Sequence, residues 1–151
     1  MNDVERFLAH AVVLEREAAR RYEELSAAMG TEGNAELKAL FAKMARYSRQ
    51  HLAQANARAG FRDVPPLAAD EYVWPDGTAP ETADWVGVDA QTGPREALEL
   101  ALSSERRGHA YYAAIAATST DPAVRRLAQE FTQEEAEHVA ELEKLLARCA
   151  A

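Results

Sequence analysis

Four long segments of the chain repeat apolar residues at alternating steps of three and four. This spacing keeps the apolar side chains on one face of an α-helix, so each segment is predicted to be an amphipathic helix. The predicted helices cover about residues 3–29, 34–59, 94–118 and 121–149. Residues that favour helix starts stand at the four beginnings, namely Asn2 or Asp3, Asn34, Pro94, and Asp121 with Pro122. Gly30 is the expected end of the first helix, and the whole pattern predicts an all-α fold.

The connections between these segments predict how the helices are arranged. Only a few residues separate the first helix from the second and the third from the fourth, and short connections make antiparallel neighbours. Residues 60–93 can cross from one end of a bundle to the other, because about 12 extended residues would span such a helix. The aromatic residues of this crossover are expected to pack on the bundle: Phe61, Tyr72, Trp74 and Trp85. Residues 1–151 are thus predicted to form one domain, a four-helix bundle of two antiparallel hairpins joined by a long crossover.

The composition excludes several classes of partner. The net charge of -8 and the pI near 5.0 would repel nucleic acid and anionic membranes. No apolar stretch approaches the length of a membrane span, and the N-terminus lacks the pattern of a secretion signal. The single cysteine, Cys149, excludes an internal disulfide and a site built on CxxC pairs. A soluble, cytoplasmic protein is expected.

Side chains of metal-ligand type interrupt the apolar stripes near their middles. The interruptions are Glu15 in the first helix, Ser48 and His51 in the second, Glu105 in the third, and Glu135 and His138 in the fourth. A buried carboxylate without a partner costs several kcal/mol, and the stripes contain no Lys or Arg to neutralise the glutamates. Protonation or a bound cation must therefore neutralise them. Carboxylates and imidazoles together are typical ligands of iron and manganese, so the pattern predicts a metal site.

The positions match the ligand pattern of di-iron bundles, in which two helices each give a Glu and two others each give a Glu-x-x-His motif. Five of the six ligands are present, and Ser48 occupies the position of the sixth. The chain also looks internally doubled. Glu15 precedes Tyr22 by seven residues, and Glu105 precedes Tyr112 by seven.

With these motifs the chain resembles the rubrerythrin branch of the ferritin-like superfamily over all four helices. The matching stretches are "EREAARRY", "FAKMARYSRQH", "SERRGHAYY" and "EFTQEEAEH". The resemblance implies a ferritin-like four-helix bundle that holds two irons and reacts with oxygen or peroxide. By this likeness Glu15 and Glu105 would be terminal metal ligands, and Glu135 would be a bridging ligand. His51 and His138 would each give one nitrogen ligand to a metal ion.

The chain departs from that family in three ways. Ser48 stands where the family has its other bridging glutamate, and Gly108 stands where rubrerythrin has an additional glutamate. The chain also shows no rubredoxin-type domain, which would carry cysteine pairs. Two divalent ions would leave one positive charge in excess over three glutamates, and a serine hydroxyl is a weak, neutral ligand. We therefore expect one firmly bound metal ion and a second that is weaker, absent, or bridged by hydroxide or an exogenous anion. His109, one turn after Glu105, could compensate from the edge of the stripe.

Several of these residues also have a purely structural interpretation. His51 is either a metal ligand or a buried, hydrogen-bonded histidine. Tyr22 and Tyr112 are either core residues or hydrogen-bond donors to the ligands. His10 is rotated off the inward face, so it is expected to be structural or exposed.

Three functions follow from these alternatives. The first is an oxidoreductase in which iron, or manganese, reduces peroxide or oxygen. The second is a metal-binding or storage protein without turnover, which in this superfamily requires assembly into a cage or a host shell. The third is a helical interaction module whose metal site has decayed at Ser48. The resemblance also implies a homo-oligomer, expected to be a dimer, with Val12 and Val13 as candidate contacts.

Overall fold

The structure is a computed structural model that describes residues 2–60, 66–74 and 92–149. Its helices are α1 (Asp3–Glu32), α2 (Ala35–Arg58), the short 3₁₀ helix η1 (Ala69–Glu71), α3 (Pro94–Thr118) and α4 (Pro122–Cys149). The described residues contain no strand, so the predicted all-α four-helix bundle is confirmed. None of these helices is both long and apolar enough to cross a membrane. Phe61 and Trp85, which were predicted to pack on the bundle, lie outside the described residues.

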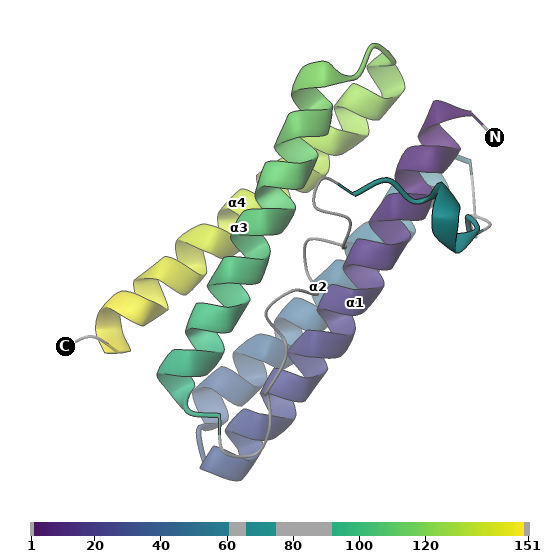
Figure 1. Ribbon diagram of the computed structural model, residues 1–151. Helices are drawn as coiled ribbons and strands as arrows, with labels where there is room; N and C mark the ends of the chain where they lie inside the picture. The colour runs from purple at the N-terminus through teal and green to yellow at the C-terminus, as the bar shows by residue number, and fades with distance from the viewer. Residues whose placement is uncertain (1, 61–65, 75–91, 150–151) are drawn as a thin grey trace.

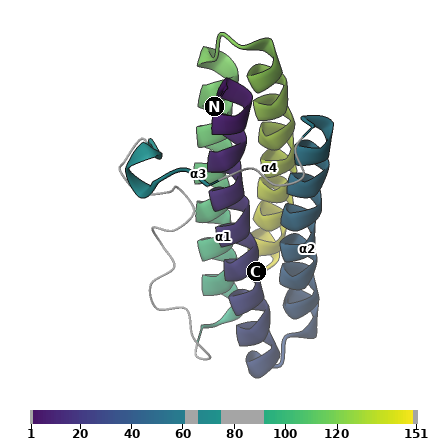
Figure 2. The same cartoon turned by 90° about the vertical axis from the view of Figure 1, so that its right-hand side faces the viewer.

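The four long helices form two antiparallel hairpins that lie side by side (Figures 1 and 2). One hairpin is α1 with α2, and the other is α3 with α4. Most contacts between helices lie within a hairpin, whereas the hairpins meet chiefly where α1 packs on α3 and α4. The chain leaves α2 at one end of the bundle and enters α3 at the other end, as a crossover requires (Figure 1).

Side chains at the helix starts explain where the helices begin. Asn2 and Glu5 form a reciprocal capping box at α1, in which Asn2 Oδ1 accepts the Glu5 backbone N–H at 2.8 Å. The side chains of Asn34 and Asp121 each accept a backbone N–H from the first turn of α2 and α4. These bonds satisfy amide groups that have no partner within the helix.

The end of α1 differs from the prediction. Gly30 is helical, and α1 continues to Glu32. Gly33 ends the helix instead, with a φ of 83° and a backbone N–H that donates to the Gly30 carbonyl. A position whose backbone must be left-handed strongly favours glycine. Inside a helix, glycine costs about 1 kcal/mol. The stop therefore falls on the glycine whose backbone must be left-handed.

The interior consists of two apolar clusters with a polar layer between them. One cluster includes Tyr22, Phe41 and Leu142, and the other includes Phe7 and Phe131. Along each long helix, the polar interruption falls between residues of one cluster and residues of the other. The buried polar side chains at this boundary include Glu15, Ser48, Glu105 and Glu135. The predicted metal-ligand positions therefore lie at mid-bundle.

His10 attaches the described part of the crossover to α1. It is buried, its Nδ1 donates to a carbonyl of the preceding helical turn at 2.8 Å, and its Nε2 accepts the Val73 backbone N–H at 3.0 Å. Its ring meets those of Tyr72 and Trp74 edge-on, with centroids 5.1 and 4.8 Å away. His10 is thus structural, and two of the predicted crossover aromatics do pack on the bundle.

Candidate metal centre

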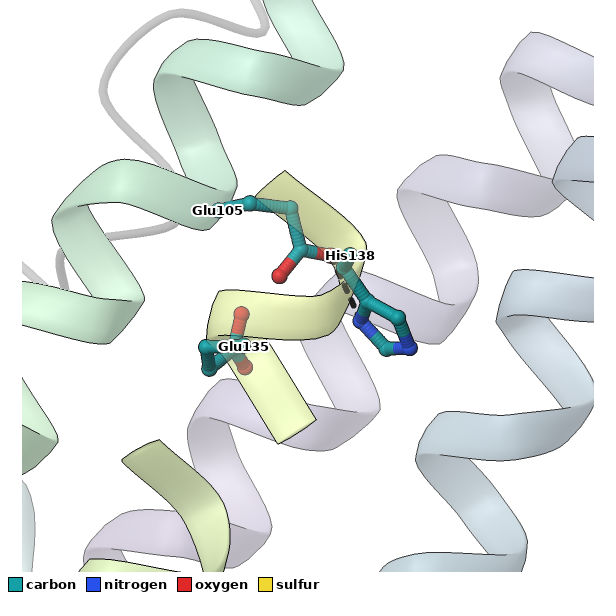
Figure 3. A group of neighbouring side chains, drawn as sticks. All are labelled: Glu105, Glu135 and His138. Carbon is teal, nitrogen blue, oxygen red and sulfur yellow. Dashed lines mark ion pairs between the residues drawn. The ribbon is translucent and has the colours of Figure 1, made fainter. Parts of the chain in front are cut away.

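Three of the predicted ligands meet at the middle of the α3–α4 hairpin (Figure 3). Glu105 comes from α3, and Glu135 and His138 come from α4. One candidate ligand atom from each residue lies within 4.8 Å of the other two. His138 Nδ1 is 3.4 Å from Glu105 Oε1. Glu135 and His138 point into the same space because residues three apart share one face of a helix.

The donor atoms of this group fit a divalent metal ion. Glu105 Oε2 and Glu135 Oε2 are buried and make no hydrogen bond among the described residues. His138 Nδ1 is also buried and has only the ion-pair contact with Glu105 Oε1. The two glutamates are only 3% and 4% exposed. Buried polar atoms of this kind normally have a partner, because leaving them without one is costly. Two carboxylates and an imidazole are donors that iron and manganese accept.

Glu15 lies in the same polar layer but outside this group of three. It is 4% exposed and accepts a hydrogen bond from the Tyr112 hydroxyl at 3.2 Å. The Ser48 hydroxyl lies close enough to lower the pKa of Glu15 slightly. Burial, followed by the charges of Glu105 and Glu134, raises the pKa of Glu15 to about 8. In the metal-free protein, Glu15 is therefore largely protonated at neutral pH.

Burial and the neighbouring carboxylates change the pKa of His138 in opposite directions. Burial alone would lower the pKa of His138, but the carboxylates of Glu105, Glu134 and Glu15 outweigh it and raise the pKa to about 9. The imidazole of the metal-free protein is therefore protonated at neutral pH. A histidine must be neutral to bind a metal ion, so binding at His138 is coupled to proton release.

Two buried tyrosines connect the hairpins across the polar layer. Tyr22 of α1 donates to Glu105 of α3, and Tyr112 of α3 donates to Glu15 of α1. The tyrosines are 1% and 0% exposed, so they are core residues, and each also donates a hydrogen bond to a candidate ligand. In the sequence, each of these tyrosines follows a glutamate by seven residues. In the structure, each tyrosine donates to the glutamate of the other pair.

The α2 helix contributes no side chain to the group of three, whereas α4 contributes two. Ser48 is buried, and its hydroxyl group lies near the Glu15 carboxyl group. His51 is not part of the group of three, and its Nδ1 lies 2.5 Å from Glu134 Oε2. Sequence reasoning missed Glu134 because it lies one position off the inward stripe of α4, within a glutamate-rich stretch. Its one sequence signal is that it is adjacent to Glu135.

His109 is also absent from the group of three. It lines a surface groove between α3 and α4 together with Arg106, Ala136 and Glu143. A step of four residues turns the side chain by about 40° from the direction of Glu105. His109 therefore faces this groove, and the structure does not show it compensating for Ser48.

Comparisons with known proteins agree with this architecture. No curated protein matches the chain. The crystal structure of an uncharacterized conserved protein from Magnetospirillum magnetotacticum MS-1 is similar, with a TM-score of 0.77 and 38% sequence identity. The similarity covers 98% of this chain and 95% of that one. The family model of the ferritin-like domain matches residues 8–151, and the chain therefore belongs to the ferritin-like family.

Proposed function

We propose that the protein is a non-haem iron oxidoreductase of the rubrerythrin type that acts on peroxide or oxygen. The observation that carries this proposal is the group formed by Glu105, Glu135 and His138, with its buried donor atoms between two apolar clusters. Manganese would suit the same donors.

Each residue of the layer has a distinct part in this proposal. Glu105, Glu135 and His138 would hold the metal, and Glu15 would add a further carboxylate after losing its proton. Bound iron would supply the electrons that reduce the oxidant. Tyr22 orients Glu105 through its hydrogen bond. Tyr112 orients Glu15 in the same way. Apolar clusters flank the layer on both sides along the bundle.

An acidic groove adjoins the candidate centre at His138. It lies between α2 and α4, has a volume of about 500 Å³, and is lined by Glu130, Glu134, Glu137, His138 and Glu141, with Lys43 and Tyr47 on the side of α2. A groove lined by carboxylates attracts cations, so it suits the entry of a ferrous ion. His138 lies in its wall and also belongs to the metal-ligand group.

The test is anaerobic reconstitution of the full chain with ferrous iron, followed by mixing with peroxide or with oxygen. We expect bound iron that oxidises faster than free iron, and loss of binding in Glu135→Ala. Glu143→Ala is the matched control, because this exposed glutamate lies on the same helix but outside both the group of three and the acidic groove.

The three functions give different results in this test. Iron that binds but oxidises no faster than free iron would favour the storage or binding protein, as would assembly into a large shell. A dimer in solution would count against storage. No bound iron in the wild-type chain would favour a helical module with a decayed site.

A further inference from the structure

Residues 66–74 of the crossover form a turn with hydrogen bonds of its own. The Leu67 backbone N–H donates to the Tyr72 hydroxyl at 3.1 Å, and the Glu71 backbone N–H donates to the Ala68 carbonyl at 2.9 Å. Leu67 is buried in one of the two apolar clusters of the bundle. The bonds within the turn do not involve the helices, so the turn can leave α1 without losing them.

His10 holds this turn on α1 in one protonation state. Its Nδ1 lies 2.8 Å from the Arg6 carbonyl oxygen, and its Nε2 lies 3.0 Å from the Val73 backbone nitrogen. A carbonyl can only accept and a backbone N–H can only donate, so Nδ1 must carry a proton and Nε2 must keep its lone pair. The docked arrangement therefore requires a neutral ring with its proton on Nδ1.

Protonation of His10 removes the acceptor that the turn uses. Both nitrogens of a charged imidazole carry a proton, so Nε2–H would face the N–H of Val73, donor against donor. The ring is only 6% exposed, and burying a charge without a partner is costly. Within the described residues, no carboxylate forms an ion pair with His10 that would compensate the charge.

The other groups around His10 come from the turn, from α3 and from α1 itself. The rings of Tyr72 and Trp74 contact it, and Tyr111 of α3 stands behind Trp74 with the centroids of their rings 5.5 Å apart. Tyrosine and tryptophan side chains are uncharged at neutral and acidic pH. Aromatic faces attract cations, which opposes release, whereas the exposed Arg6 adds a positive charge one turn earlier on α1.

We propose that His10 is a pH-sensitive latch, which holds residues 72–74 on α1 while its ring is neutral and releases them when the ring is protonated. Histidine changes its charge between about pH 5 and 8, so release belongs to mildly acidic conditions. Trp74 would then leave Tyr111, whose ring packs on the tyrosine that donates to Glu15. Release would loosen this side of the polar layer. The latch needs no metal ion, so it is independent of the proposed function.

The experiment measures hydrogen exchange of the Val73 amide by NMR between pH 7 and pH 5, in the full chain without metal. After correction for the intrinsic exchange rate, the protection of Val73 should fall by up to about 10-fold per pH unit, the limit for release coupled to one proton. The amide of Leu25, a buried residue of α1, is the reference for unfolding of the whole bundle, and its protection should not fall in this way. ¹⁵N labelling of histidine should show the proton of neutral His10 on Nδ1.

Two variants test whether His10 is the titrating group. His10→Gln offers Val73 an amide oxygen that does not titrate, so the pH dependence of Val73 protection should disappear. His109→Gln removes a half-buried histidine of α3 and should leave that pH dependence as in the wild type.

Four results would each overturn the inference. The first is a wild-type Val73 protection that stays constant or rises as the pH falls, as it would if the aromatic rings held the charged imidazole in place. The others are the same pH dependence in His10→Gln, an equal fall in protection at Leu25, and a neutral His10 that carries its proton on Nε2.

Discussion

The hydroxyl group of Tyr22 reaches from α1 to a buried carboxylate of Glu105 on α3. Removing this donor in Tyr22→Phe keeps the apolar ring but leaves the carboxylate with one fewer partner. We expect the free energy of unfolding to fall by about 1 kcal/mol and ferrous affinity to fall by about 10-fold or more. Chemical unfolding and anaerobic metal titration measure the two effects. Tyr47→Phe, at an exposed tyrosine, should change neither, and unchanged metal affinity in Tyr22→Phe would contradict the orienting role.

The titration of two buried groups predicts how the stability of the metal-free protein depends on pH. The pKa of Glu15 is raised from 4.5 to about 8, and the pKa of His138 is raised from 6.5 to about 9. Both groups bind protons more tightly when folded, so their contribution is complete below the unfolded pKa and is lost as pH rises through the folded pKa. The free energy of unfolding should therefore fall from about pH 5 to about pH 9.

Urea unfolding in the presence of a chelator at three pH values within this window measures the slope. Glu15→Gln removes one of the two groups, so it should flatten the decline, whereas Glu137→Gln should not. A stability that rises with pH over the same window would show that neither group holds its proton as described.

At the scale of elements, the two glycines near the end of α1 make a matched pair. Gly33 has a φ of 83°, where a Cβ is strained, so Gly33→Ala should lower the free energy of unfolding by about 1 kcal/mol. Gly30 is helical, and the nearest atoms to a Cβ there belong to the flexible side chain of Lys38, with Cδ at 3.2 Å. Gly30→Ala should therefore be neutral or stabilise by up to about 1 kcal/mol. Chemical unfolding compares them, and equal effects would contradict the assignment of the stop to Gly33.

The attachment of the crossover to α1 depends on His10. In His10→Ala, the Val73 backbone N–H loses its acceptor and the rings of Tyr72 and Trp74 lose their contact. We expect the free energy of unfolding to fall by about 1–3 kcal/mol and the Val73 amide to exchange faster with solvent. Hydrogen exchange measured by NMR gives both quantities. His109→Ala, at a half-buried histidine on α3, should leave the exchange of Val73 unchanged.

For the whole molecule, metal binding should oppose the loss of stability at high pH. A ligand that binds only the folded state at 100 times its dissociation constant adds about 2.7 kcal/mol. Protons compete with the metal for Glu15 and His138, so the gain from ferrous iron should be larger at pH 8 than at pH 6. Anaerobic thermal unfolding with and without iron tests this, with Glu135→Ala as the variant that should not respond. An equal gain at both pH values would argue against binding at these residues.

The fold could be predicted from the sequence because every long helix carries its own signals. The apolar stripes, the caps at Asn34 and Asp121, and the short connections all indicate the same bundle. The site was predictable only as far as the inward stripes reach. They identified Glu135 and His138, but Glu134 lies one position off the stripe and becomes visible only when α2 and α4 are placed together in space. The choice between Gly30 and Gly33 depended on backbone geometry, which residue type alone does not determine.

The concentration of contacts within the two hairpins has a consequence for how the chain folds. Each hairpin closes over only two or three residues, so its contacts are local in sequence and are expected to form early. The residues between α2 and α3 then act as a tether, which raises the effective concentration of one finished hairpin near the other. The entropy of closing such a tether changes slowly with its length. Docking of the halves should thus tolerate crossovers of different lengths, as long as the tether can span the bundle.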